Sequence, residues 1–221
     1  MRGDGSCRFR AFRIIAFYMI RAVVFDLGKV LVDFDYSIAV TKIASRSTIS
    51  LMELARLVAQ SPLLLQYETG LLTTQQFYEA VCGACGFAGN FDEFGTCFGD
   101  IFTPIDPMVE LHAELRRRGL PTYIFSNTNE LAVRHIRNNF PFFSNFDGYI
   151  LSYEHGAMKP GAKLYEVVEH MTERRGDEIL YLDDRPENVE AGAARGWQVI
   201  LQENPDKTRA AITTLGLLNH A

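Results

Sequence analysis

The feature that most constrains the fold is a short apolar run that ends on a carboxylate. Residues 22–25, Ala-Val-Val-Phe, are followed at once by Asp26, Leu27 and Gly28. A continuous apolar run of this length is typical of a strand that is covered on both faces in a parallel sheet. In open α/β sheets, ligands bind beyond the carboxyl ends of the strands. Asp26 therefore either caps the following turn or belongs to a functional site.

Beyond residue 104, strand patterns alternate with amphipathic helix patterns. The predicted strands are 122–125, 148–152, 179–182 and 197–201, and the predicted helices are 108–118, 130–138, 161–174 and 186–195. Gly119 and Gly196 follow two of these helices, where glycine commonly ends a helix. The alternation predicts right-handed crossovers and hence an α/β fold with a doubly wound, Rossmann-like parallel sheet.

Residues 36–103 differ in character, because they contain no convincing strand pattern. Asp35 can cap a helix over 36–44. Further helix starts are indicated by a capping residue three positions before Glu or Gln: Ser50 with Glu53, Thr73 with Gln76, and Asn90 with Glu93. We therefore expect an all-helical insert of about four short helices, with a loop at 67–70.

These changes of pattern divide the chain into three parts. The α/β core is expected to comprise residues 19–35 and 104–221, and the helical cap residues 36–103. Residues 1–18 form an N-terminal extension, in which Arg13 splits the apolar part and no cleavage pattern of a signal peptide follows. Since Met19 directly precedes the first strand, we expect the native start there, with the extension non-native or disordered.

Composition excludes several classes of partner. The net charge is -5, and five arginines against one aspartate in residues 1–21 leave -9 for the remainder, so we expect no nucleic-acid partner. No apolar run reaches the 18 or so residues of a membrane span, which predicts no membrane association. Cys82 and Cys85 form the only close cysteine pair and lack partners at zinc-site spacing, which favours reduced thiols and a cytoplasmic protein.

Polar residues follow several predicted strands: Asp26, Ser126, Lys159, Asp183 and Asp184. Parallel strands bring their carboxyl ends to one edge of the sheet, so we expect these side chains to lie together. Three neighbouring carboxylates repel one another unless a cation lies among them, and oxygen ligands suit Mg²⁺ that shares its shell with a phosphate. A lysine and a serine hydroxyl can bind the remaining phosphate oxygens.

Each of these residues also has a purely structural interpretation. Ser126 could begin a turn, Lys159 could be a solvated lysine in a loop, and the aspartates at 183–184 could cap the helix that starts at Pro186. Taken together these interpretations fit poorly, because all the coincidences would fall on the same edge of the sheet.

The motifs resemble those of a known superfamily. Asp-x-Gly-x-Val after a strand, Ser-Asn-Thr-Asn, Lys-Pro and Asp-Asp-x-x-x-Asn occur in the order found in haloacid dehalogenase superfamily hydrolases, and the helical insert resembles their C1 cap. The resemblance covers residues 22 to about 201. Within the superfamily it is most similar to sugar-phosphate phosphatases, including α-D-glucose-1-phosphate phosphatases, and to the N-terminal phosphatase domains of epoxide hydrolases.

The resemblance implies a phosphoric monoester hydrolase that acts on a small phosphorylated metabolite, with a sugar phosphate as the expected substrate. Asp26 would be the nucleophile that forms an aspartyl-phosphate. Ser126 and Lys159 would act with it and bind the phosphoryl oxygens, and Asn127 would donate to the phosphate.

The resemblance also implies a metal site and reveals one departure. Asp184 would ligate Mg²⁺ together with Asp26 and the backbone carbonyl of Gly28, and Asp183 would act through a water. The family commonly carries a second aspartate at the position of Gly28, which protonates the leaving oxygen and later activates water. Only the backbone of Gly28 can serve the site, so the acid is missing from this motif.

Other residues near the motifs are weaker candidates. Asn188 replaces an aspartate that the family often carries, and it would orient the site rather than ligate the metal. Lys29 and His155 are the nearby groups that could supply a proton, although His155 is better explained as a surface histidine. Tyr67, Glu68 and Gly70 are candidates for a substrate-facing loop or a plain turn between helices.

Two other functions remain open. A catalytically weak phosphate-binding or regulatory protein could keep the site without turnover, and a haloacid dehalogenase would use the same nucleophile on carbon. The Asp183-Asp184 pair speaks against the dehalogenase, since that reaction needs no cation there. Substrate turnover and magnesium dependence separate the three, and nothing in the sequence sets an oligomeric state.

Overall fold

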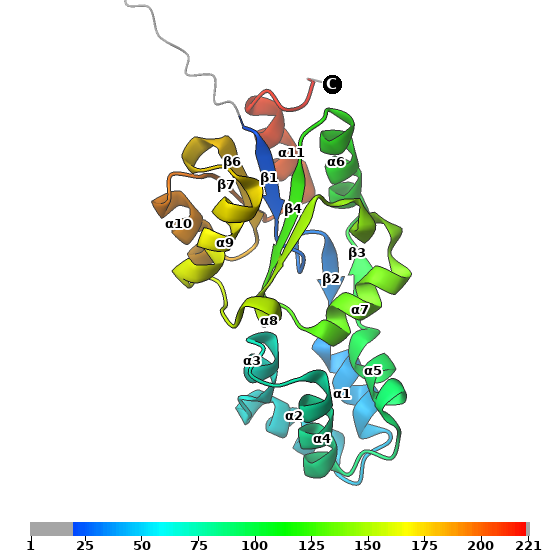
Figure 1. Cartoon of the computed structure of the whole chain (residues 1–221). Helices are drawn as coiled ribbons and strands as arrows, with labels where there is room; N and C mark the ends of the chain where they lie inside the picture. The colour runs from blue at the N-terminus through cyan, green and yellow to red at the C-terminus, as the bar shows by residue number, and fades with distance from the viewer. Residues whose placement is uncertain (1–19, 220–221) are drawn as a thin grey trace, which may run out of the picture.

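The computed structural model describes residues 20–219, so the expectation about residues 1–18 and Met19 lies outside the described part of the chain. A five-stranded sheet forms its centre, in the order β5-β4-β1-β6-β7 (Figure 1). Every neighbouring pair in this sheet is parallel, which confirms the predicted α/β fold. The strands are β1 (Ala22–Phe25), β4 (Thr122–Ser126), β5 (Gly148–Leu151), β6 (Ile179–Asp183) and β7 (Gln198–Leu201).

Helices cover both faces of the sheet, because alternate strand residues point to opposite sides. Phe25 packs in one apolar cluster with residues of α6 (Asp106–Arg117), α7 (Glu130–Asn139) and α11 (Pro205–Thr214). Val24, its neighbour in β1, packs in another cluster with residues of α9 (Ala162–Thr172) and α10 (Pro186–Ala194). The sheet is therefore the middle of three layers, and β1 is buried on both faces, as its apolar sequence predicts.

A helical insert lies below the carboxyl edge of the sheet in Figure 1. Its helices are α1 (Tyr36–Ala44), α2 (Leu51–Gln60), α3 (Leu63–Glu68), α4 (Thr74–Cys85) and α5 (Phe91–Gly99). The chain enters it through β2 (Val32–Phe34) and leaves through β3 (Phe102–Pro104), which pair antiparallel. The sequence patterns do not predict this two-stranded ribbon, because three residues are too few to show a strand periodicity.

The helix starts in the insert follow the capping signals in the sequence. Reciprocal capping boxes join Ser50 with Glu53, Thr73 with Gln76, and Asn90 with Glu93, and the Asp35 side chain caps α1. The prediction of a loop at 67–70 is wrong for its first half, because α3 begins after Pro62 and continues through Glu68. The described insert therefore has five helices rather than about four.

Contacts with α7 fix the insert on the core. The Tyr67 hydroxyl accepts a hydrogen bond from the Leu131 backbone N–H at 3.0 Å, and Leu131 packs in the apolar cluster of the insert. On α5, a Cβ added to Gly99 would lie 3.1 Å from the His135 Cβ and 3.3 Å from the Leu131 carbonyl oxygen. Glycine at this position therefore permits the close approach of α5 to α7.

Shorter elements complete the described chain: α8 (Ser152–His155) and the 3-10 helices η1 (Pro141–Asn145) and η2 (Gly176–Glu178). The sequence patterns missed α11, although Asn204 caps it and Pro205 occupies its first position. Cys82, Cys85 and Cys97 are free thiols. Among the described residues, no helix has the length and apolar character needed to cross a membrane.

Candidate active site

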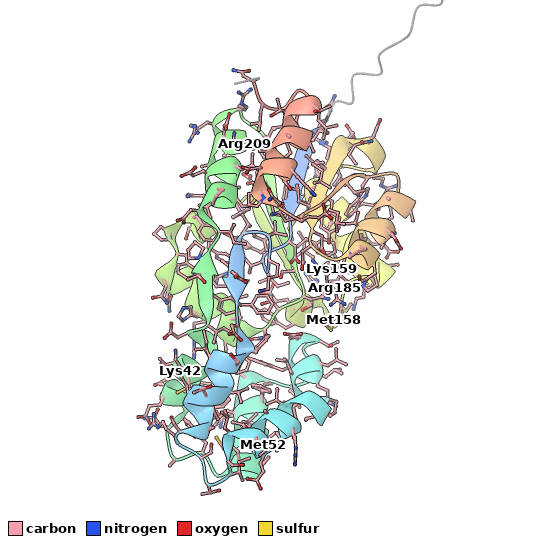
Figure 2. The ribbon with its side chains drawn as sticks, turned by 180° about the vertical axis from the view of Figure 1, so that it is seen from behind. Lys42, Met52, Met158, Lys159, Arg185 and Arg209 are labelled. Carbon is pink, nitrogen blue, oxygen red and sulfur yellow. The ribbon has the colours of Figure 1, made fainter. Side chains whose placement is uncertain are left out.

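Five side chains meet at the carboxyl edge of the sheet, as the sequence predicts. Asp26 follows β1, Ser126 ends β4, and Asp183 and Asp184 stand at the end of β6, whereas Lys159 comes from the loop after α8. A cavity of about 260 Å³ opens here between core and insert, and all of these except Asp183 line it. In Figure 2, Lys159 lies beside Met158 and Arg185 at this junction.

Lys159 forms ion pairs with both Asp26, the candidate nucleophile, and Asp183. Its side chain is buried, and its ammonium group lies 3.0 Å from Asp26 Oδ1 and 2.6 Å from Asp183 Oδ2. The same group donates to the Phe125 carbonyl oxygen at 2.8 Å. All three ammonium hydrogens thus have acceptors, which holds the cation at one place between two carboxylates.

Asp183 is buried, and its carboxylate is the common acceptor of several hydrogen bonds in the site. It accepts hydrogen bonds from the Tyr181 hydroxyl, from Asn188 Nδ2 at 3.0 Å and from the Arg185 backbone N–H at 2.9 Å. Burial alone would raise its pKa, but Lys159 and these donors hold the pKa below the usual value, so the group is ionised. Asn188 therefore orients Asp183, in keeping with the role expected for it.

The other two carboxylates are in a less favourable environment. Burial, opposed by Lys159, raises the pKa of Asp26 to about 7. Burial and the nearby Asp183 also raise the pKa of Asp184. Carboxylate oxygens of Asp26, Asp183 and Asp184 lie within 4.8 Å of one another. The three carboxylates share this space with a single lysine, Lys159, which already pairs with Asp26 and Asp183. The oxygen ligands therefore fit a hard cation such as Mg²⁺.

Asn127 is bound to the backbone of Lys159. Asn127 Oδ1 accepts from the Lys159 N–H at 2.8 Å, and Asn127 Nδ2 donates to the Lys159 carbonyl oxygen at 3.0 Å. This pair of bonds joins the end of β4 to the loop after α8 and thereby sets the position of the lysine. One Nδ2 hydrogen is left to face the cavity, which Asn127 also lines.

The space beside Gly28 is filled by an aromatic ring. A Cβ added to Gly28 would lie 2.8 Å from Phe34 Cε1, and Phe34 packs in turn against Tyr36 and Phe102. Lys29 adopts a φ of 57°, and its ammonium group pairs with the Asp33 carboxylate. Motif one therefore offers a backbone to the site but no proton donor held against the reacting centre.

His155 gives no substitute for that donor. It ends α8, is half-exposed and does not line the cavity. Its carbonyl oxygen accepts from Lys163 Nζ at 2.5 Å. The expectation of a surface histidine agrees with this position.

Of the three residues expected on a substrate-facing loop, only Glu68 lines the cavity. Tyr67 is buried in the insert, and a Cβ on Gly70 would clash with the Tyr153 carbonyl oxygen of α8. The Glu68 backbone carbonyl accepts from Ser152 Oγ at 2.5 Å, which anchors the end of α3 to the core. In the sequence, this docking is indicated by a helix end that is closely followed by Gly70. The φ of Gly70 is 74°, a backbone conformation that favours glycine.

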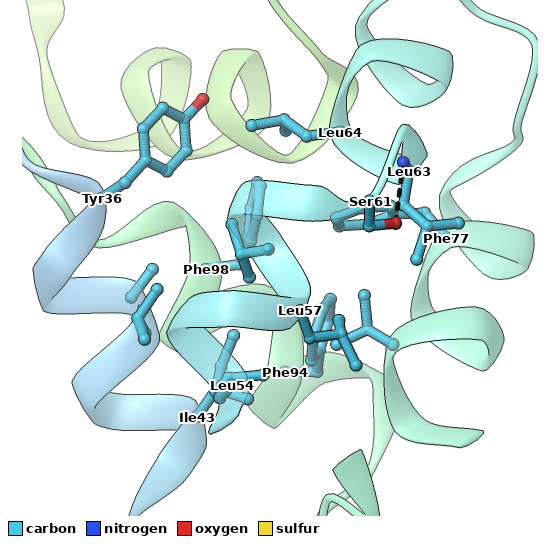
Figure 3. A pocket seen from close by; sticks show the side chains of 14 residues that line it. Tyr36, Ile43, Leu54, Leu57, Ser61, Leu63, Leu64, Phe77, Phe94 and Phe98 are labelled. Atoms are coloured by element: carbon cyan, nitrogen blue, oxygen red, sulfur yellow. Dashed lines mark hydrogen bonds between the residues drawn. The ribbon is translucent and has the colours of Figure 1, made fainter. Parts of the chain in front are cut away.

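A second, apolar cavity lies inside the insert (Figure 3). It has a volume of about 40 Å³ and is enclosed by side chains of α1 to α5 such as Leu54, Phe77 and Phe94. Tyr36 and Leu64 line both this cavity and the one at the sheet edge. Apart from Tyr36 and Ser61, the described residues that line it are apolar, and none is a carboxylic acid or a lysine, so we assign the chemistry to the cavity at the sheet edge.

Comparisons with known proteins identify phosphatases among the relatives of this chain. The chain is 24% identical over 205 residues to the D-ribitol-5-phosphate phosphatase of Bacteroides thetaiotaomicron, covering 89% of this chain and 98% of that protein. It is 27% identical over 179 residues to a sesquiterpene phosphatase of Aspergillus oryzae, covering 80% of this chain and 86% of that protein.

Solved structures show the same fold. A haloacid dehalogenase family enzyme from Bacteroides thetaiotaomicron, crystallised with magnesium and inorganic phosphate, superposes with a TM-score of 0.71 at 21% identity, covering 84% of this chain and 96% of that one. Residues 20–196 match the model of the family described as haloacid dehalogenase-like hydrolase. The chain therefore belongs to the haloacid dehalogenase-like hydrolase family.

Proposed function

We propose that this protein is a Mg²⁺-dependent phosphatase of small phosphorylated metabolites, with Asp26 as the nucleophile. The observation that carries the proposal is the position of Asp26. It follows the central strand of the sheet, its backbone N–H donates to the Leu182 carbonyl oxygen at 2.8 Å, and Lys159 lies 3.0 Å from its side chain. A carboxylate held rigidly beside a buried cation suits attack on a phosphoryl group.

In this proposal the phosphoryl group lies against Asp26, Ser126 and Lys159. An Asp26 oxygen forms a bond to phosphorus as the bond to the leaving oxygen breaks, which gives an aspartyl-phosphate. The charge of the Lys159 ammonium attracts the phosphoryl oxygens, the Ser126 hydroxyl donates to them, and Asn127 keeps the lysine loop in place. Water then attacks the phosphorus, and the electron pair of the breaking bond returns to the Asp26 carboxylate.

Asp26, Asp184 and the Gly28 carbonyl would hold the Mg²⁺, which would neutralise charge on the transferring group. Asp183 would reach it only through water, since both its oxygens already accept hydrogen bonds from Asn188, Arg185 or Tyr181. Asp183 then acts mainly through Lys159. The crystallised relative that contains magnesium and phosphate supports this assignment.

A sugar or polyol phosphate is the first candidate for the substrate. The curated relative named as a D-ribitol-5-phosphate phosphatase supports it, and Glu68 and Arg185 line the cavity with polar groups that suit hydroxyl groups. A second candidate is the phosphate of an apolar alcohol. Phe34, Leu64 and Met158 line the same cavity, and the other curated relative is a sesquiterpene phosphatase.

A panel of phosphate monoesters tests the proposal. Sugar, polyol, isoprenoid and aryl phosphates would be assayed for phosphate release with Mg²⁺ and with excess EDTA. We expect turnover that requires Mg²⁺ and is abolished in Asp26→Asn, with Asp206→Asn on exposed α11 as the matched control. Circular dichroism would check that Asp26→Asn remains folded.

The outcome separates the remaining alternatives. Binding of inorganic phosphate without turnover of any ester would support a phosphate-binding protein instead. Release of halide from 2-haloacids in the presence of EDTA would support a dehalogenase. Full activity of Asp26→Asn would show that the nucleophile lies elsewhere.

A further inference from the structure

We propose that Glu68, a residue of the insert, is the general acid and base of the reaction. It would transfer the protons that a second aspartate in motif one, at the position of Gly28, transfers in other family members. This inference rests on the proposed phosphatase function. It assigns a catalytic proton to a residue of α3, about forty positions beyond the motif that lacks it.

The first support is the closed position at Gly28. The Phe34 ring occupies the space into which a side chain at this position would extend. A proton donor at position 28 would therefore require Phe34 to move. Lys29, the neighbouring residue, is held away by Asp33 and by the Phe34 carbonyl oxygen at 3.1 Å.

The second support is the set of carboxylic acids that line the cavity. Among the described residues, the carboxylic acids that line it are Asp26, Asp184 and Glu68. Asp26 is assigned as the nucleophile and Asp184 as a metal ligand, so Glu68 is the carboxylic acid to which no role has been assigned. It belongs to the insert, whereas the phosphate site belongs to the core. A leaving group that extends from the phosphate site across the cavity meets the residues of the insert that line it, and Glu68 is the carboxylic acid among them.

The third support is the way the carboxyl is held. The Tyr36 hydroxyl donates to Glu68 Oε1 at 3.2 Å, and Ser152 anchors the backbone of the same residue. Asn129 Nδ2 is buried and has no hydrogen-bond partner among the described residues. It lies close enough to lower the pKa of Glu68 without making a bond of ordinary geometry. The carboxyl therefore has one hydrogen-bond donor, Tyr36, and a second donor nearby, the unpaired Asn129 amide, that can stabilise its ionised form.

The protonation state suits the task. Burial raises the pKa of Glu68 to about 7, against the opposing effects of Tyr36 and Asn129. Near neutral pH the group therefore exists in both forms, as an acid and then a base requires. Burial also raises the pKa of Tyr36, which stays a neutral donor.

Other titratable groups surround this cavity and must be considered in any pH profile. Those that line it are Asp26, Lys29, Tyr36, Lys159, Asp184 and Arg185. The elements that pack against α3 contribute Tyr78, Glu79, Cys82 and Cys85 from α4 and Tyr153, Glu154 and His155 from α8. Of all these, Tyr36 is the one hydrogen-bonded to the Glu68 carboxyl.

The proton balance is complete within the proposed reaction. In the first step an Asp26 oxygen bonds to phosphorus, the P–O bond to the leaving group breaks, and the leaving oxygen takes the proton of Glu68. In the second step the Glu68 carboxylate removes a proton from the attacking water. Inorganic phosphate leaves, and Asp26 and Glu68 return to their starting forms.

The test compares Glu68→Gln with the wild type on aryl phosphates with acidic phenols and on alkyl phosphates. An acidic phenol leaves without a proton, so we expect its kcat/KM, which reports formation of the aspartyl-phosphate, to change less than about tenfold, whereas kcat/KM for alkyl phosphates should fall by about 10²- to 10⁴-fold. The slope of log kcat/KM against leaving-group pKa should steepen accordingly. Glu154→Gln, on the exposed side of α8, is the matched control and should leave the slope unchanged.

The pH profile gives a second readout, which needs no variant. For alkyl phosphates, kcat/KM of the wild type should fall above about pH 7, and for acidic aryl phosphates it should not. Tyr36→Phe removes a donor that lowers the pKa of Glu68, so it should move the alkaline limb to higher pH.

Two results would overturn the inference. One is an equal loss of kcat/KM on aryl and alkyl phosphates in folded Glu68→Gln, which would indicate substrate positioning alone. The other is a wild-type alkaline limb that is the same for both substrate classes. An absence of phosphate release by the wild type from every ester would instead refute the phosphatase proposal itself.

Discussion

The ring of Phe34 stands where a side chain at position 28 would have to go, with 2.8 Å between its Cε1 atom and a Cβ built on Gly28. Phe34 is held in turn by Tyr36, Phe102 and the ammonium group of Lys29, 4.8 Å from its ring centre. An acid at position 28 would require this aromatic packing to shift. The glycine in motif one is therefore part of a packing arrangement and not merely a lost aspartate.

Restoring the family aspartate should accordingly harm the protein. We expect Gly28→Asp to lower the melting temperature and the rate of phosphate release, because the carboxyl must displace Phe34. Adding Phe34→Ala should recover part of the lost activity by opening space. Thermal denaturation and single-substrate kinetics on the single and double variants would measure this, and a Gly28→Asp protein that is more active than the wild type would contradict it.

The adjacent aspartates at the end of β6 should respond differently to neutralisation. Asp183 is fully buried and pairs with Lys159 at 2.6 Å, so Asp183→Asn should cost about 3 kcal/mol of unfolding free energy. Asp184 is half-buried and has no such pair, so Asp184→Asn should preserve stability and raise the Mg²⁺ concentration needed for activity. Denaturant titrations and Mg²⁺ dependence of the rate would separate the two effects. Equal stability losses would count against the assigned roles.

Glu68 should leave a mark on the pH dependence of stability. Its pKa is about 7 in the folded protein and 4.5 ordinarily, so between these pH values the folded state keeps a proton that the unfolded state has released. Stability contributed at low pH is thus lost as the pH rises through this window. In Glu68→Gln this loss should be absent, and the variant should gain up to about 3 kcal/mol relative to the wild type between pH 4.5 and pH 7. Urea titrations of both proteins across the window would test it, with no relative gain as the contrary result.

Two glycines of the insert form a matched pair for testing how it docks. Gly99→Ala should destabilise the protein, because the new methyl meets His135 Cβ at 3.1 Å and the Leu131 backbone at 3.3 Å. Gly83 lies in α4 with nothing within 4 Å of an added Cβ, so Gly83→Ala should stabilise by about 0.5–1 kcal/mol. The melting temperatures of the two variants should therefore move in opposite directions. A stabilising Gly99→Ala would mean that α5 and α7 can separate at little cost.

The sequence predicted the core of the site because its parts are strand ends. Asp26, Ser126 and Asp183 each terminate or follow an apolar run, and a parallel sheet leaves no choice about the edge on which such residues meet. The helix starts of the insert were predictable for a similar reason, since a capping box is local in sequence.

The missed features depend on contacts between distant residues. The β2–β3 ribbon pairs Phe34 with Phe102, and the whole insert separates these two residues in the sequence. A local sequence pattern therefore does not predict the pairing. Glu68 was predicted as a candidate for a substrate-facing loop, whereas it ends the helix α3. What makes it part of the site is the docking of α3 onto Ser152, a contact across 84 positions. The filled space at Gly28 depends likewise on the rotamer of a side chain six residues away.

The pairing of Val32 with Pro104 and of Phe34 with Phe102 has a consequence for engineering. The two points at which the insert joins the core are neighbours, so the length and shape of what lies between them place no strain on the sheet. A helical segment from another family member could be grafted between these strands while Asp26, Lys159 and Asp183 stay where β1, β4 and β6 hold them. Such chimeras would inherit their proton donor, or its absence, from the donor of the graft, so that leaving-group preference would travel with the transplanted helices.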